Sequence, residues 1–194
     1  MKPSICAGIL AGGKSSRMGQ NKALLPYGGH SFLEQLIQVC SVFPEVLLSV
    51  DRTAPYAHLG VPMVVDQLAG FGPLEGIYQL LRACQSPYLL AVATDMPQLS
   101  PAFLLALAES LEGQEDCLVL LRDGRPEPLC SIYGKGALPV LERMRQEGCH
   151  RPRMLFEQVN TRWVELGDLG FGAEAVANIN TPEEYAALDR KILP

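Results

Sequence analysis

The sequence has little positive charge for its size. It contains 16 lysines and arginines against 21 aspartates and glutamates in 194 residues, which gives a formal net charge of -5 at pH 7. Proteins that bind nucleic acid generally carry a basic surface that faces the phosphate backbone. The charge balance therefore excludes a general nucleic-acid binder. An acidic chain can still bind an anion where its cations are gathered in one place.

Long apolar runs and paired cysteines are also missing. No stretch reaches the length of about 20 apolar residues that a membrane-spanning helix needs. The apolar run at residues 5–11 is short and leads into Gly and Lys without the cleavage pattern of a secretory signal. The six cysteines are dispersed and include no Cys-x-x-Cys pair, so they indicate neither a zinc site nor a disulfide framework. We expect a cytoplasmic protein with reduced, mostly buried thiols and no membrane partner.

Short apolar runs alternate with longer amphipathic stretches along the chain. The apolar runs predict strands at 4–10, 45–50, 62–65, 88–94 and 117–121, and the amphipathic stretches predict helices at 31–42, 74–84, 101–112, 136–147, 152–158 and 182–190. Ser31, Ser100 and Thr181 are expected N-caps of three of these helices. Alternating strands and helices require crossover connections, which predict a mainly parallel sheet with helices on both faces.

The alternation changes in the stretch RDGRPEPLCSIY at residues 122–133. An Asp-Gly turn followed by a short β-prone run predicts a hairpin-like excursion and an antiparallel strand in the sheet. The sequence shows no internal repeat and no linker long enough to divide it. The expected fold is therefore one α/β domain over residues 1–194, a Rossmann-like three-layer sandwich.

The stretch LAGGKSSRMGQNK at residues 10–22 follows the first expected strand. Open parallel sheets bind ligands beyond the carboxyl ends of their strands. Two adjacent glycines there allow a tight turn that brings backbone N–H groups near a ligand, and Lys14, Arg17 and Lys22 add positive charge. The spacing fits neither a Walker A loop nor a G-x-G-x-x-G fingerprint. We expect a polyanion, with a nucleoside triphosphate as the natural ligand; the alternative is a plain turn with solvated cations.

This loop resembles the signature L-A-G-G-x-S-x-R-M-G-x-x-K of the nucleotidyltransferases related to molybdenum cofactor guanylyltransferase. Every fixed position matches, and four further segments are similar in the same order: VVDQLAGFGPLEGI at 64–77, ATDMPQL at 93–99, RDGRPEPLCSIY at 122–133 and NINTPEEY at 178–185. The resemblance implies a nucleotidyltransferase fold of the GT-A-like type. It also implies GTP as donor, Mg²⁺ as cofactor, and the terminal phosphate of molybdopterin, carrying molybdenum, as acceptor. Pyrophosphate and molybdopterin guanine dinucleotide would be the products, with transient contacts to molybdoenzymes or other cofactor-synthesis proteins.

Two aspartates each follow an apolar run. Asp95 closes LLAVATD and Asp66 closes PMVVD. A carboxylate at the end of a parallel strand can hold Mg²⁺ against bound phosphates, which is the role expected of Asp95; a turn or cap residue is the alternative. The resemblance implies the same role for Asp95 and a nucleotide contact at Asp66. The following GFGPLEG stretch, which includes Gly72, lets a base or ribose approach the backbone closely.

The resemblance also places a second substrate site at Asn178 and Asn180, just before a capped helix. Asn180 could instead belong to the helix cap. Two positions depart from the family pattern: Ser49 stands where relatives often have an asparagine that contacts the nucleotide, and Glu75 stands where many have a small residue. The contact at Ser49 therefore stays open, and Glu75 is expected to alter either the helix start or the base pocket.

Nucleotidyl transfer depends on positioning and charge stabilisation, because the attacking phosphate is already anionic and needs no general base. Arg17 and Lys14 would hold the leaving phosphates, and Lys22 would offset charge at the α-phosphate. The expected catalytic residues are Lys22, Arg17 and Asp95, with Asp95 as the metal ligand. The expected nucleotide-binding residues are Leu10, Ala11, Gly12, Gly13, Lys14, Lys22, Asp66, Gly72 and Asp95, and the expected acceptor residues are Asn178 and Asn180.

Two other functions compete with this interpretation. One is a related enzyme that uses CTP on molybdopterin, or a nucleotide on a sugar phosphate. The LAGG and GPLEG stretches resemble the guanine-using branch, but the residues contain no physical proof of guanine over cytosine. The other is a nucleotide-binding adaptor that delivers cofactor without catalysis. Retention of Lys14, Arg17, Lys22 and Asp95 together argues against an adaptor, which would not need all four.

Overall fold

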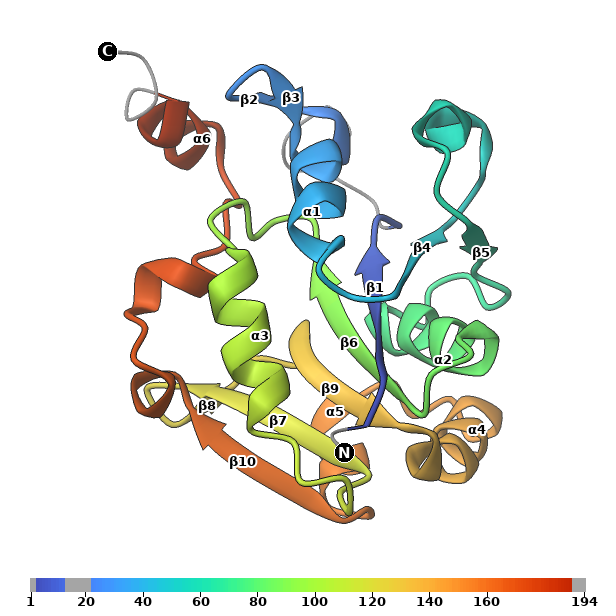
Figure 1. Cartoon of the computed structure of the whole chain (residues 1–194). Helices are drawn as coiled ribbons and strands as arrows, with labels where there is room; N and C mark the ends of the chain where they lie inside the picture. Colours follow the sequence, from blue (N-terminus) through green and yellow to red (C-terminus); the bar gives the residue numbers. More distant parts are fainter. Residues whose placement is uncertain (1–2, 13–21, 190–194) are drawn as a thin grey trace.

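An eight-stranded sheet forms the centre of the computed structural model, which describes residues 3–12 and 22–189 (Figure 1). The strands of the sheet are β1 (Ile5–Leu10), β4 (Glu45–Val50), β5 (Met63–Val65), β6 (Tyr88–Ala93), β7 (Cys117–Arg122), β8 (Arg125–Pro126), β9 (Cys130–Gly134) and β10 (Thr161–Glu165). A separate pair consists of β2 (Pro26–Tyr27) and β3 (His30–Ser31). The helices are α1 (Phe32–Cys40), α2 (Pro73–Ala83), α3 (Pro101–Glu109), α4 (Leu138–Gln146), α5 (Pro152–Phe156) and α6 (Pro182–Asp189).

Two strands, β9 and the short β8, run against the strands they pair with in a sheet that is otherwise parallel. The strand order is β10-β7-β9-β6-β1-β4-β5, with β8 paired to β7. β9 pairs antiparallel with both β6 and β7, while β6, β1, β4 and β5 pair in parallel. The expected mainly parallel sheet with an antiparallel strand is confirmed. Because β9 runs in the opposite direction, its first residue lies at the same edge as the last residues of β6, where Val92 pairs with Cys130.

The two faces of the sheet carry separate apolar clusters. Ile5, Ala7 and Ile9 of β1 pack with side chains of α1 and α3, whereas Cys6 and Leu10 pack with α2, α4 and α5. Successive residues of a strand point to opposite faces, so this strand, buried throughout, must be apolar on both sides. Helices cover both faces of the sheet in Figure 1, which confirms the three-layer arrangement.

Capping residues set the helix starts as expected. Ser31 Oγ accepts a hydrogen bond from the backbone N–H of Glu34, whose carboxylate bonds back to the N–H of Ser31. Ser100 Oγ accepts from the N–H of Phe103, and Thr181 Oγ1 accepts from the N–H of Glu184. Each cap satisfies a backbone donor that has no partner within the first helical turn.

Several expected bounds were wrong. The helix expected over 136–147 begins with a 3₁₀ turn at Lys135–Ala137, and α4 itself spans Leu138–Gln146. The helix expected over 101–112 ends at Glu109, and that expected over 152–158 ends at Phe156. The edge strand β10 was not predicted, because TRWVE lacks both a buried run and clear alternation. Its identity as a strand depends on pairing with β7.

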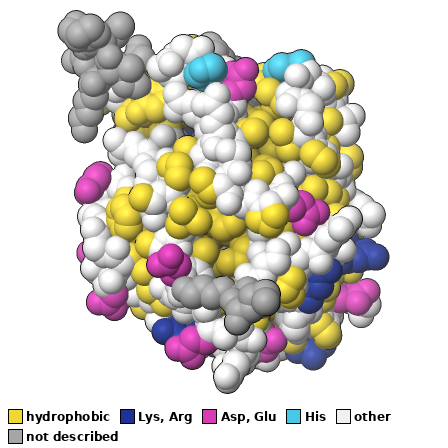
Figure 2. All heavy atoms as spheres, in the orientation of Figure 1, with side chains coloured by type: hydrophobic (Ala, Val, Ile, Leu, Met, Phe, Trp, Pro, Cys, Tyr) yellow, Lys and Arg dark blue, Asp and Glu magenta, His cyan; other side chains and the backbone are white. Residues whose placement is uncertain are grey.

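Positive charge is unevenly spread over the face of the molecule shown in Figure 2. The carboxyl ends of β1 and β6 point toward the top of the view in Figure 1. On the face shown in Figure 2, apolar side chains spread across the middle, and the described Lys and Arg side chains lie in the lower half. Within the described ranges, no helix has the length and apolar character needed to cross a membrane.

Gly76 marks the closest approach of α2 to the sheet. A Cβ added there would lie 2.5 Å from both Ser49 Oγ and Leu10 Cδ2. We predict that Gly76→Ala lowers the free energy of unfolding by about 1–3 kcal/mol, because overpacking outweighs the better helix propensity of alanine. Gly167→Ala, where an added Cβ meets nothing within 4 Å, is the matched control and should change stability by less than about 0.5 kcal/mol. Denaturant unfolding measures both; equal stabilities would contradict the prediction.

Candidate active site

Four strand ends and one late segment meet at the carboxyl edge of the sheet. The N–H of Asp66 donates to the carbonyl of Val50 at 2.9 Å, which sets the end of β5 beside the end of β4. The N–H of Ile179 donates to the carbonyl of Asp95 at 2.8 Å, which joins the segment before α6 to the end of β6. The residues thus gathered at this edge are Gly12, Lys22, Ser49, Asp66, Asp95, Asn178 and Asn180.

Three expected site residues cannot be placed. Gly13, Lys14 and Arg17 lie outside the described residues. Their expected contacts with the phosphates of a nucleotide stay predictions. The described part of the chain ends at Gly12 and begins again at Lys22.

Asp66 is held against the start of that loop. Ser49 Oγ donates to Asp66 Oδ1 at 2.7 Å, and a Cβ added to Gly12 would lie 3.3 Å from Asp66 Oδ2. Burial raises the pKa of Asp66; the bond from Ser49 opposes this, and the charges of Glu75 and Asp51 add to it. Ser49 itself is 1% exposed, and its hydroxyl is bonded to the Asp66 carboxylate. The nucleotide contact that the sequence left open at Ser49 stays open.

The backbone polar groups at the start of the loop are hydrogen-bonded to other parts of the protein. The N–H groups of Ala11 and Gly12 both donate to the carbonyl of Ser49, at 2.9 and 3.1 Å, and Tyr56 Oη donates to the carbonyl of Ala11 at 3.0 Å. Leu10 and Ala11 are buried. These bonds fix the turn onto β4. Backbone donors offered to a phosphate would therefore come from residues after Gly12.

Gly72 precedes α2 in a conformation that glycine alone adopts readily. Its φ is 78° and its ψ is -163°, and an added Cβ would meet nothing within 4 Å. Gly70 also has a positive φ, of 81°. Without side chains, both residues present bare backbone just before α2, where Pro73 occupies N1. This geometry permits the close approach of a flat ligand that the sequence predicts.

Asp95 and Asn178 each bring a buried oxygen without a partner. Among the described residues, Asp95 Oδ1 and Asn178 Oδ1 are the buried side-chain polar atoms that lack a hydrogen bond. Burial raises the pKa of Asp95, while the charge of Lys22 and the residue's own N–H oppose the rise. Buried acceptors are normally satisfied, and carboxylate and amide oxygens are the ligands that hard cations prefer. The pair therefore fits a divalent metal.

The metal would need ligands beyond the protein. Within residues 3–12 and 22–189, no three His, Cys, Asp or Glu side chains form a cluster that could hold an ion. Mg²⁺ is commonly bound through one or two carboxylates together with substrate phosphates and water. The donor set at Asp95 and Asn178 matches that kind of site.

Lys22 is held in place from the far end of the sequence. Its Nζ donates to Asn180 Oδ1 at 2.9 Å, across 158 residues of chain. The backbone N–H of Asn180 donates to Glu184 Oε2 at 2.6 Å, beside the bond from the N–H of Thr181 to the same oxygen. The cap role expected of Asn180 is thus confirmed for its backbone, and its side chain bonds Lys22. Its expected role at a second substrate site stays a prediction.

Arg122 and Glu127 are further charged residues at this edge that sequence reasoning missed. Arg122 Nη2 lies 2.6 Å from Glu127 Oε1, and Arg122 Nη1 donates to the carbonyl of Val176 at 3.4 Å. Burial raises the pKa of Glu127; Arg122 opposes this and the charge of Asp95 adds to it. Both residues belong to the 122–133 segment that carries the resemblance. The resemblance of this segment to the family was the signal that could have pointed to Arg122 and Glu127. Their position at the carboxyl edge depends on the reversed direction of β9.

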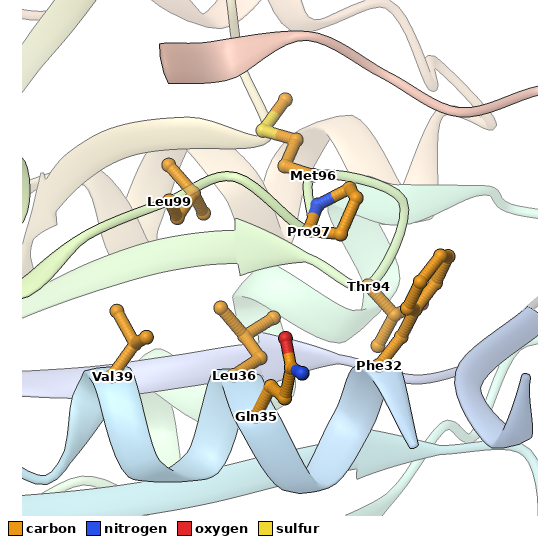
Figure 3. A pocket seen from close by; sticks show the side chains of 8 residues that line it. All are labelled: Phe32, Gln35, Leu36, Val39, Thr94, Met96, Pro97 and Leu99. Carbon is orange, nitrogen blue, oxygen red and sulfur yellow. The ribbon is translucent and has the colours of Figure 1, made fainter. Parts of the chain in front are cut away.

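A narrow apolar groove lies beside this edge, between α1 and the segment after β6 (Figure 3). It is lined by Phe32, Gln35, Leu36, Val39, Thr94, Met96, Pro97 and Leu99. Gln35 and Thr94 supply its polar groups, and no lining side chain is charged. The groove therefore lacks what a triphosphate requires, and the candidate site is the charged edge beyond Asp95.

Comparison with known proteins agrees with this geometry. Residues 7–162 match the model of the MobA-like NTP transferase domain. A probable molybdenum cofactor guanylyltransferase from Carboxydothermus hydrogenoformans is 37% identical over 188 residues, covering 95% of each chain. Another from Pelotomaculum thermopropionicum is 33% identical over 183 residues, covering 91% of this chain and 87% of that protein.

A solved structure shows the same fold. Molybdopterin-guanine dinucleotide biosynthesis protein A from Archaeoglobus fulgidus superposes with a TM-score of 0.83 at 25% identity, covering 96% of this chain and 97% of that one. The match to the family model spans the glycine loop and the strands β4, β5 and β6, which contain or precede Ser49, Asp66 and Asp95. This chain belongs to the family of MobA-like NTP transferases.

Proposed function

We propose that this protein transfers GMP from GTP to the terminal phosphate of molybdopterin, carrying molybdenum, and releases pyrophosphate to form molybdopterin guanine dinucleotide. The observation that carries the proposal is the convergence of the unpartnered oxygens of Asp95 and Asn178 with the Lys22–Asn180 pair at the carboxyl edge. The names of the relatives from C. hydrogenoformans and P. thermopropionicum support the choice of guanine.

The metal proposed at Asp95 is Mg²⁺, with Asn178 as a neighbouring oxygen donor. When bound, the ion would offset negative charge on the nucleotide phosphates. Lys22 would offset charge that develops around the α-phosphate, and the bond to Asn180 keeps its ammonium group directed at this edge. The acceptor phosphate is already anionic at neutral pH, so no residue is required to remove a proton. Catalysis by this chain is then positioning and electrostatic stabilisation.

The donor nucleotide would lie over the ends of β1, β4 and β5. Asp66, oriented by Ser49, is the proposed contact to the nucleoside, with the bare backbone of Gly72 beside the base. Gly12 leaves room for the nucleotide next to Asp66. Gly13, Lys14 and Arg17 are proposed to hold the β- and γ-phosphates as they leave, as the signature sequence implies.

The acceptor would approach from the side of Asn178 and Asn180. Ile179, between these two residues, bonds the Asp95 carbonyl, which keeps both of them beside Asp95. We also propose a cytoplasmic location, supported by six free cysteines of which five are buried, and transient contact with proteins that supply or receive the cofactor.

The choice of nucleotide can be tested directly. We predict that pyrophosphate release in the presence of Mg²⁺ and molybdopterin carrying molybdenum is supported by GTP at least 100-fold better than by CTP, ATP or UTP. Release with CTP instead would agree with the chemistry proposed at Asp95, but it would show that the enzyme uses cytosine and not guanine. Binding of nucleotide without release from any of the four would favour a non-catalytic adaptor or another acceptor, such as a sugar phosphate.

Replacing Asp95 separates metal-assisted catalysis from structural damage. We predict that Asp95→Asn lowers kcat by at least 10³-fold while the metal-free protein unfolds at the same temperature or higher. Burial raises the pKa of Asp95, so its ionised form costs stability above the ordinary pKa, and a neutral amide removes that cost. Asp168→Asn, an exposed carboxylate beyond the edge strand β10, is the matched control for single-turnover kinetics and thermal unfolding. Wild-type turnover in Asp95→Asn would remove this carboxylate from the mechanism.

Lys22 is predicted to act on the chemical step. Lys22→Ala should lower kcat by about 10²–10³-fold, the usual effect of removing one group that stabilises charge in the transition state. Asn180→Ala should lower kcat less, by about 10-fold, because it loosens the ammonium group but leaves it present. Steady-state kinetics with circular dichroism as a folding control measures both. A Lys22→Ala variant with normal kcat would contradict its assigned role.

A further inference from the structure

Glu75 is a buried carboxylate that departs from the family pattern. It lies in the first turn of α2 and is 1% exposed. Its Oε1 accepts hydrogen bonds from the backbone N–H of Gln67 at 3.0 Å and of Leu68 at 3.3 Å, and from Gln79 Nε2 at 2.8 Å. The Glu75 side chain thus ties the loop after β5 to α2.

Arg145 completes the arrangement from α4. Its Nε lies 2.7 Å from Glu75 Oε2, and its Nη2 lies 3.1 Å from Glu75 Oε1, so the pair is bidentate. The guanidinium carbon lies 4.1 Å from the ring centroid of Tyr78. Burial alone would raise the pKa of Glu75, but the bonds from Arg145, Gln79 and Gln67 outweigh it and lower the pKa. Glu75 is therefore an ionised and fully partnered carboxylate at neutral pH.

The two backbone groups that Glu75 holds lie directly after Asp66. Residues 67–70 are exposed, and Gly70 and Gly72 both have positive φ, a conformation that glycine adopts readily. At its other end, Phe71 is buried and its ring lies 6.3 Å from that of His150. The loop at residues 66–72 is thus anchored at its start by one carboxylate and at its end by one aromatic side chain.

We propose that Glu75 is a positioning residue for the donor nucleotide: the bidentate pair with Arg145 keeps loop 66–72 in the conformation that places Asp66 beside Gly12 and presents the backbone of Gly72. This inference rests on the proposed function, in which Asp66 and Gly72 contact the nucleoside of a nucleoside triphosphate. Glu75 touches no reacting group. Its effect is preorganisation, which improves affinity by raising the fraction of protein that is ready to bind.

Because Glu75 is proposed to act on nucleotide binding and not on the chemical step, weakening its pair with Arg145 has a specific expected kinetic pattern. Loosening the loop lowers the binding-competent fraction, and the apparent Kd rises in inverse proportion to that fraction. A fall to about one tenth raises the Kd and the KM for the nucleotide about tenfold. The kcat at saturating nucleotide and the KM for the acceptor stay the same, because Asp95, Lys22 and Asn178 are untouched. A merely structural role would change stability without this selective effect on nucleotide binding.

Two variants and a matched control test the proposal. Glu75→Gln removes the charge that holds Arg145, and Arg145→Gln removes the partner while leaving Glu75. Arg143→Gln is the control on the same helix, since Arg143 is exposed and bonds to the exposed side chain of Gln158. Titration with GTP and Mg²⁺, without acceptor, should show an approximately tenfold higher Kd for the first two variants and less than a twofold change for the control. If Glu75→Gln fails to fold, Arg145→Gln still supplies the test.

Hydrogen exchange supplies a readout that does not depend on turnover. In the nucleotide-free protein, the N–H groups of Gln67 and Leu68 should exchange at least tenfold faster in Glu75→Gln and Arg145→Gln than in wild type. Faster exchange with unchanged Kd would show that the pair only supports the fold and would overturn the proposal, as would unchanged exchange. A wild-type protein that binds no nucleoside triphosphate would instead overturn the proposed function, and this inference with it.

Discussion

One backbone hydrogen bond, from the N–H of Ile179 to the carbonyl of Asp95, organises the charged edge of this protein. It holds the segment before α6 at the end of the central strand β6. Asn178 and Asn180 precede and follow the bonded residue. The first brings an unpartnered oxygen to the same region as the unpartnered oxygen of Asp95, and the second reaches Lys22. A single contact between distant parts of the chain therefore brings together the groups proposed to serve metal and acceptor.

The same edge concentrates acidic groups whose ionised forms are disfavoured by burial. The pKa values of Asp66, Asp95 and Glu127 are all raised, with burial as the largest cause in each case. Buried charges are costly unless they are partnered. Glu75 shows the alternative, because enough donors surround it to lower its pKa. The contrast is sharpest between Glu75, which is satisfied within the protein, and Asp95, whose buried Oδ1 has no partner and which a cation would complement.

Local sequence signals were sufficient for the main elements and for three helix caps. Apolar runs identified the buried strands, and Ser31, Ser100 and Thr181 marked helix starts because capping depends on residues only three positions apart. The same kind of signal could not identify β10, whose status depends on a partner strand. It also could not pair Lys22 with Asn180, or Glu75 with Arg145, which are separated by 158 and 70 residues. Such contacts follow from the topology of the sheet, which local periodicity does not encode.

The reversed strand β9 has a consequence for the order in which the protein can assemble. β6 forms one long edge with β1, but its other edge remains unpaired until residues 130–134 are available. During synthesis on the ribosome, an apolar strand edge would thus stay open while β7 is still being made, and open edges can pair with other chains. The segment that carries Asn178 and Asn180 emerges later still. The strands of the sheet therefore all precede, in the order of synthesis, the residues that complete its carboxyl edge.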